Sequence, residues 1–218
     1  FFSSQVWGQQ PVPVIIALNN EMNRYRHLAE YAVQVSLNIS ILVTKMTEEV
    51  FMKSDEIESW AMQVEDEVIA RAQEVSPKSI KAADCVQNLF ILRSIKDMRA
   101  HVKQSTKCLH DEANINAMFE TMLTTTLNHH RSHVIEGRRA MENCAQTADP
   151  TFSAKCLNII SKELKDTETK TISTMKKIQN RTTKRRNDLT GKMRICELLS
   201  SKFVETLRKN LDELKRCA

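Results

Sequence analysis

Apolar residues recur at alternating spacings of three and four between Val14 and Val75, a stretch that contains no glycine or proline. This alternation is typical of an α-helix that buries one stripe of its surface. A single helix of this length would extend roughly 90 Å, at about 1.5 Å per residue. We therefore expect a break near 53–55, where Ser54 is placed to cap a second helix. The two buried rows are expected to hold Leu18, Tyr25, Ala32, Ile39 and Met46, and Met22, Ala29, Val43, Val50, Ile57 and Val64.

Similar stripes predict four further helices, at about 80–112, 114–146, 150–186 and 192–217. Pro77 ends the first stretch, and 111–116, 147–150 and 187–191 have the composition of turns. Three of the helices have similar lengths and short connections, which is typical of an antiparallel up-and-down bundle. Their stripes are predicted to contain Cys85, Leu89, Leu92, Ile95 or Met98, Val102, Leu109, Met118, Met122, Leu127, Val134, Met141, Cys156, Leu157, Ile160, Leu164, Ile172, Met175, Ile178, Ile195, Leu199, Phe203, Leu207, Leu211 and Leu214.

The scarcity of glycine and proline supports an all-α fold. The chain has three glycines and four prolines, too few for the many turns of a sheet protein, while good helix formers dominate. Residues 1–13 hold three of these seven and no helical period, so we expect an extended arm that packs on the bundle or on a partner. The predicted organisation is this arm, a long helix or helix pair at 14–76, and a disulfide-linked bundle at 79–217. The fold class is an all-α antiparallel bundle of five or six long helices.

Six scattered cysteines indicate disulfides, because none forms a C-x-x-C pair and no histidine lies at zinc-finger spacing. In an antiparallel bundle, the number of residues between a cysteine and the nearest predicted turn gives its level along the bundle axis. Cysteines at matching levels form the preferred pairs Cys144–Cys156, Cys108–Cys196 and Cys85–Cys217. A rival scheme pairs Cys85 with Cys144 and Cys156 with Cys217, since all four are expected near one end. Either scheme leaves the first helical stretch held by packing alone.

Disulfides imply an oxidising compartment, and two glycosylation sequons, at Asn38 and Asn180, agree with secretion. The first ten residues lack the basic segment and apolar run of a signal peptide, so we interpret them as a mature N-terminus after processing. No stretch reaches the roughly 18 apolar residues that a membrane-spanning helix needs. The predicted location is extracellular, and the chain is predicted not to be transmembrane.

The segment from Lys176 to Arg194 is strongly basic, with eight basic residues against one acid. Such a cluster can bind an anionic polysaccharide, a lipid headgroup or an acidic protein, or it can be a solvated helix end. Nucleic acid is not expected, because no aromatic residue is interleaved. An acidic segment at 48–67 can also pair with it. The candidate anion-binding residues are Lys176, Lys177, Arg181, Lys184, Arg185, Arg186, Lys192 and Arg194.

His129, His133 and Glu136 follow each other at spacings of four and three, so they share one helical face. Two imidazoles and a carboxylate can hold a metal ion, but such pairs also occur on helices without one. The H-E-x-x-H pattern of zinc peptidases is absent. We expect no metal, and regard a pH-responsive surface patch as the alternative.

Enzyme signatures are missing: there is no G-x-S-x-G, no P-loop and no cysteine expected to be free. We therefore expect a protein that is not an enzyme, has no cofactor, and binds a protein partner or its own copies through helix faces. One alternative is an extracellular carrier that opens around a lipid or other hydrophobic ligand, which ten methionines would suit. Another is a helical cytokine-like ligand.

The stretch from Asp84-Cys85 to Cys196, with long glycine-free helices and cysteines near their predicted ends, resembles secreted insect proteins of the TsetseEP-domain family. The resemblance rests on this pattern and implies a non-catalytic extracellular role. It implies no site residues. The helical stretch 14–75 has no counterpart in the family pattern.

Overall fold

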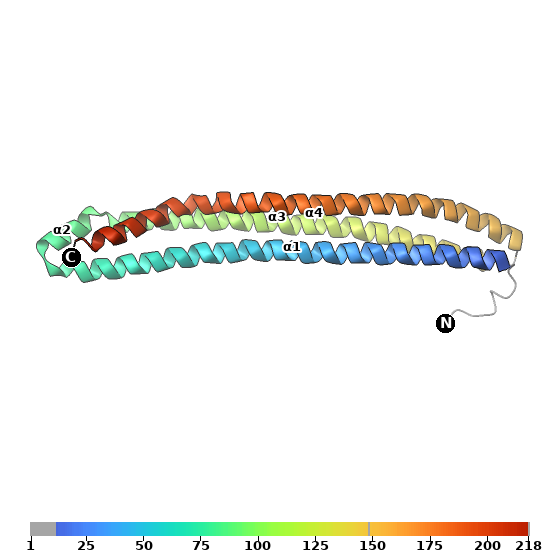
Figure 1. Cartoon of the computed structure of the whole chain (residues 1–218), viewed down its shortest axis with the longest axis horizontal. Helices are drawn as coiled ribbons and strands as arrows, with labels where there is room; N and C mark the ends of the chain where they lie inside the picture. Colours follow the sequence, from blue (N-terminus) through green and yellow to red (C-terminus); the bar gives the residue numbers. More distant parts are fainter. Residues whose placement is uncertain (1–11, 148, 218) are drawn as a thin grey trace. The chain divides into compact units, whose positions relative to one another are not determined.

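The computed structural model describes residues 12–147 and 149–217, and these form three long helices and one short one (Figure 1). The elements are α1 at Val12–Val75, a short 3₁₀ turn η2 at Ser76–Lys78, α2 at Ile80–Asn88, α3 at Ile91–Ala145 and α4 at Pro150–Leu214. The all-α prediction is confirmed, since no strand occurs in the described part. The prediction of five or six long helices is wrong.

The three predicted interruptions are absent because each contains residues that the bundle buries. Ser54 is 2% exposed and continues the buried row of α1. In α3, Ala113 and Asn116 are buried where a turn was expected, and in α4 Leu189 is 1% exposed. These buried residues lie at helical spacing from the apolar residues on either side, so each helix keeps one face toward the core. Burial of that face outweighs the local preference of the segment for a turn.

The same continuity corrects several stripe assignments. A turn at 111–116 or 187–191 would have restarted the helical phase, but each helix runs on through these segments. Side chains placed on the wrong phase are therefore exposed: Met118 (73%), Met122 (46%), Ile195 (57%) and Leu199 (39%). Leu92 (83%) is exposed for the opposite reason, because the helix ends at Asn88 and restarts at Ile91.

The true helix boundaries carry the expected signals. Pro77 lies in η2, and the Ser79 hydroxyl caps α2 by accepting a hydrogen bond from the backbone N–H of Ala82 at 3.0 Å. Pro150 begins α4, and the Asp149 carboxylate accepts from the N–H of Thr151 at 2.8 Å. Helix α1 begins at Val12, so the last two residues of the predicted arm are helical. Residues 1–11 lie outside the described range.

The chain divides into two units, and each is built from segments of α1, α3 and α4. Unit 1 comprises residues 12–42 and 119–183, and unit 2 comprises residues 43–118 and 184–217 within the described range. In unit 1, α1 runs antiparallel to α3, as the 3.1 Å hydrogen bond from Ser40 to Glu120 and the approach of Tyr25 to Gly137 indicate. In unit 2, the contacts of Phe51 with His110 and of Glu65 with Arg99 give the same direction.

Each unit has its own apolar core. The core of unit 1 holds Leu18, Tyr25, Leu28, Val134, Met141, Cys144, Ala145, Leu157, Ile160 and Leu164. The core of unit 2 holds Ala61, Val64, Val68, Ile91, Ile95, Met98, Val204, Leu207 and Leu214.

The three disulfides follow the preferred pairing, and the rival scheme is wrong. The bonds are Cys85–Cys217, Cys108–Cys196 and Cys144–Cys156, with Cα–Cα distances of 5.8, 5.5 and 5.8 Å. The midpoints of the three pairs fall at residues 151, 152 and 150 of the sequence. The single reversal between α3 and α4 near 146–149 therefore sets all three pairings. The turns near 113 and 189, from which depth was counted, do not exist.

Candidate functional site

An apolar groove of about 490 Å³ lies in unit 2, where α1, α2 and the start of α3 meet. Its walls are almost entirely uncharged, with one arginine at the edge. The lining residues are Ile69, Ala72, Gln73, Val86, Gln87, Phe90, Ile91, Leu92 and Arg93. This composition suits an apolar group, because few polar atoms would lose water when the groove fills.

Phe90 lies between α2 and α3. Among the residues that the structure describes, it is the one non-glycine residue with a left-handed backbone (φ 47°). Its N–H donates to the carbonyl of Gln87 at 3.1 Å, and its own carbonyl accepts from the N–H of Ser94 at 3.0 Å. A bulky residue in this region costs on the order of 1–3 kcal/mol, and glycine or asparagine would cost less. The chain thus ends one helix and starts the next on a strained phenylalanine.

Three large apolar side chains between Ile80 and Leu92 are exposed to water. Phe90 is 69% exposed, Leu92 83% and Ile80 82%. Helix α2, which carries Ile80, is tied to the C-terminal end by the Cys85–Cys217 disulfide. Phe90 and Leu92 place exposed apolar side chains at an apolar groove, and the disulfide anchors the neighbouring α2. Such an arrangement is typical of a preformed binding surface.

Arg93 is the charged residue that lines the groove, and it has no ion-pair partner in the described part of the chain. Its side chain is exposed. A carboxylate or a carbonyl oxygen of a bound molecule would find a donor there.

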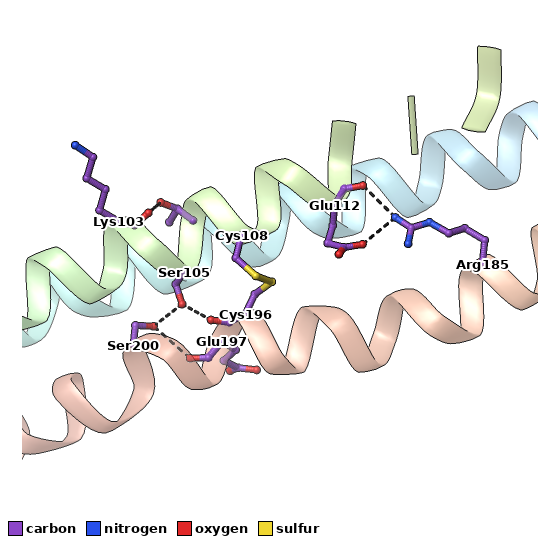
Figure 2. Close-up of a disulfide and its surroundings, with 9 residues drawn as sticks. Lys103, Ser105, Cys108, Glu112, Arg185, Cys196, Glu197 and Ser200 are labelled. Carbon is purple, nitrogen blue, oxygen red and sulfur yellow. Dashed lines mark hydrogen bonds and ion pairs between the residues drawn. A yellow bond between two sulfur atoms is a disulfide. The ribbon is translucent and has the colours of Figure 1, made fainter. Parts of the chain in front are cut away.

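Arg185, one of the predicted anion-binding residues, is instead committed inside unit 2. Figure 2 shows its guanidinium against Glu112: Nη2 donates to the Glu112 carbonyl at 3.1 Å and to Glu112 Oε2 at 3.0 Å. Its Nε donates to Asn116 Oδ1 at 2.9 Å, and Asn116 is fully buried. Burying an ion pair is costly unless hydrogen bonds accompany it. These three bonds hold α4 to α3 and leave Arg185 unavailable to a ligand.

The other seven predicted anion-binding residues are exposed on α4. Lys176, Lys177 and Arg181 belong to unit 1, and the remaining four belong to unit 2. Anion binding stays a prediction for these residues. The acidic segment forms ion pairs with Lys53 and Arg99, neither of which belongs to the basic cluster.

The histidine cluster forms on α3 in unit 1. His129 Nε2 lies 3.1 Å from His133 Nε2, while Glu136 Oε2 lies 3.7 Å from His133 Nδ1. Glu136 therefore faces the other nitrogen of the ring and cannot share an ion held between the two Nε2 atoms. In the described chain, no group of three or more histidine, cysteine or acidic side chains is placed to hold a metal. Burial lowers the pKa of the neighbouring His130, and the charges of His129 and His133 lower it further.

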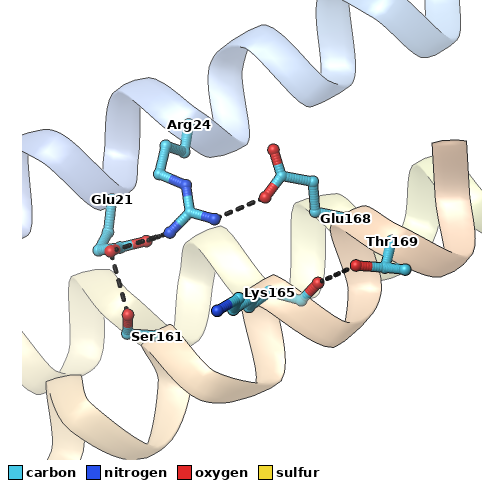
Figure 3. Close-up of polar contacts among 6 residues, drawn as sticks. All are labelled: Glu21, Arg24, Ser161, Lys165, Glu168 and Thr169. Carbon is cyan, nitrogen blue, oxygen red and sulfur yellow. Dashed lines mark hydrogen bonds and ion pairs between the residues drawn. The ribbon is translucent and has the colours of Figure 1, made fainter.

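Polar contacts, and not packing alone, attach α1 to α4 in each unit. In unit 1, Arg24 bridges Glu21 and Glu168, and Glu21 accepts from Ser161 at 3.0 Å (Figure 3). The hydrogen bond to Glu168 is the main reason that the pKa of Arg24 is raised. In unit 2, Lys53 lies 2.9 Å from Glu197, and this contact raises the pKa of the lysine.

Both sequon asparagines, Asn38 on α1 and Asn180 on α4, are exposed within helices. Whether they carry glycans stays a prediction. Among the described residues, no helix has the length and apolar character that crossing a bilayer requires.

No family model matches this chain, and no curated protein matches it either. The resemblance to TsetseEP-domain proteins therefore stays a prediction.

Proposed function

We propose that this chain is an extracellular, non-enzymatic binding protein that contacts other proteins, including copies of itself, through exposed apolar positions of its helices. The groove at the junction of α1, α2 and α3 carries the proposal, together with the exposed Phe90 and Leu92 at its edge. Three disulfides support the extracellular setting, because such bonds persist in oxidising compartments.

The energetics favour a partner over solvent at this surface. Burying one large apolar side chain contributes about 1.5–3 kcal/mol, and Phe90 and Leu92 are both mostly exposed. A few such anchors commonly supply most of the affinity of a protein interface. The Cys85–Cys217 disulfide reduces the entropy that α2 would lose on binding.

A carrier of a hydrophobic ligand is the second candidate, and one observation favours it. Both disulfides that join two long helices connect α3 to α4, whereas α1 contains no cysteine. Helix α1 can therefore separate from the other two without breaking a covalent bond. Such an opening would expose the apolar core to a lipid.

Native mass spectrometry of the secreted, enzymatically deglycosylated chain distinguishes the two candidates. Self-association predicts an oligomer that the double variant Phe90→Asn/Leu92→Ser disrupts, since asparagine tolerates the left-handed backbone. The control is Met118→Ser, which removes an equally exposed methionine elsewhere in unit 2. A monomeric mass with bound lipid would support the carrier. An oligomer unaffected by the double variant would refute the groove as the contact.

A further inference from the structure

His129 and His133 lie on the exposed face of α3, and their Nε2 atoms approach each other. The Nε2 atoms of His129 and His133 are 3.1 Å apart, and their ring centroids are 4.5 Å apart. One imidazole donates a hydrogen bond to the other in this arrangement. The hydrogen on one Nε2 thus points at the lone pair of the other Nε2, and the tautomers of the two rings set which one donates.

The spacing of these nitrogens matches that of two ligands on one metal ion. Imidazole nitrogens bind zinc at about 2.0–2.1 Å. Two such ligands lie about 2.9 Å apart at a right angle and about 3.3 Å apart at the tetrahedral angle, from these bond lengths. The observed 3.1 Å falls between the two values. An ion can therefore occupy this position once the donating ring carries its hydrogen on Nδ1 in place of Nε2, so that both Nε2 lone pairs are available.

Glu136 lies beside His133, on the side of the ring away from His129. Its Oε2 lies 3.7 Å from His133 Nδ1, the nitrogen that faces away from His129. Metal-binding histidines usually direct their second N–H to a carboxylate, which fixes the tautomer and makes the ligating nitrogen more basic. At 3.7 Å the carboxylate is beyond hydrogen-bonding distance of Nδ1, and a small side-chain movement would bring it into this role.

We propose that His129 and His133 form a two-imidazole site for a divalent transition-metal ion, with Glu136 orienting His133 and water filling the remaining positions. Imidazole ligands suit Cu²⁺, Ni²⁺ and Zn²⁺, and Cu²⁺ binds most tightly in this series. Ca²⁺ and Mg²⁺ prefer oxygen ligands and are not expected. Binding links residues one helical turn apart, so it stabilises unit 1. The site is independent of the groove.

Isothermal titration of the full-length chain, without a histidine tag, with CuCl₂ and then ZnCl₂ tests the proposal. We expect one Cu²⁺ per chain, bound more tightly than Zn²⁺. His129→Ala and His133→Ala should each weaken binding at least about tenfold, and Glu136→Gln about tenfold. His130→Ala is the matched control, because this ring is adjacent in sequence but lies outside the pair. It should stay within about twofold of wild type.

Circular dichroism of each variant confirms that helicity is kept, as both histidines are exposed. Electron paramagnetic resonance of the Cu²⁺ complex should show coupling to two nitrogens in the wild type and to fewer in His133→Ala. The proposal fails if the wild type binds no Cu²⁺, or if the variant without both histidines binds it equally well. Equal losses in His130→Ala and His133→Ala would also overturn it.

Discussion

Replacing Gly137 by alanine should destabilise unit 1, although alanine is the better helix former. Gly137 lies in α3 against the ring of Tyr25 from α1, and Tyr25 is 3% exposed in the core. A Cβ atom at 137 would come within 2.6–2.7 Å of ring atoms Cζ and Cε1 and would overlap the hydroxyl. The rigid ring has to rotate, or α1 has to move away from α3.

The expected size of the effect follows from two opposing terms. Overpacking of this kind costs about 1–3 kcal/mol. Alanine in a helix interior gains about 0.5–1 kcal/mol over glycine. The balance is a net loss of up to about 2.5 kcal/mol in the free energy of unfolding. Gly191→Ala is the matched control, since Gly191 is an exposed helical glycine with nothing within 4 Å of the added Cβ. It should stabilise by about 0.5–1 kcal/mol.

Urea unfolding followed by circular dichroism at 222 nm measures both variants. Opposite signs are expected, and Tyr25→Leu in the Gly137→Ala background should recover part of the loss through a favourable coupling energy. If Gly137→Ala stabilised the chain as much as Gly191→Ala does, the close packing of α1 on α3 in unit 1 would be refuted.

Three further changes test other parts of the structure by urea unfolding. Arg185→Ala should cost about 1–3 kcal/mol, because it leaves the half-buried Glu112 carboxylate without its partner, while exposed Arg186→Ala should change stability by less than about 0.5 kcal/mol. Removing the Cys144–Cys156 disulfide with alanine at both positions should cost about 3 kcal/mol for a short closed loop, and a negligible loss would contradict the bond. Burial raises the pKa of Tyr25 above its ordinary value of 10.0, so the folded chain holds this proton more tightly than the unfolded chain. The contribution of Tyr25 to the free energy of unfolding should therefore be fully present below pH 10 and be lost as the pH rises toward the folded pKa. Tyr25→Phe should reduce this loss of stability at high pH.

The pattern of apolar residues was sufficient for the helical class, the buried row of α1 and the helix starts at Ile80 and Pro150. It could not decide whether segments such as 187–191 are turns, because composition does not show that Leu189 is needed in the core. The disulfide pairing was nevertheless correct, since an antiparallel pair of helices keeps residues equidistant from the one reversal in register.

The sequence does not predict the candidate groove, and one of its lining residues, Phe90, explains why. Phe90 has a left-handed backbone, a conformation for which glycine or asparagine is the usual sequence signal. Leu92 was assigned to the core because its spacing fits a stripe that passes through residues 89–91, whereas the helix restarts there. The sequence groups Arg185 with a basic surface because charge alone does not reveal the half-buried Glu112 that faces it.

Hydrogen exchange of the concentrated and the dilute wild-type chain, read by mass spectrometry, tests the proposed binding surface most directly. Association through the groove predicts slower exchange at high concentration in the peptides that cover residues 76–93, which include the non-helical amides between α1, α2 and α3. Peptides that cover the exposed Phe152 and Ile159 of α4 serve as the internal reference and should not change. Protection confined to α4, or the same exchange at both concentrations in a chain shown to be oligomeric, would contradict the account.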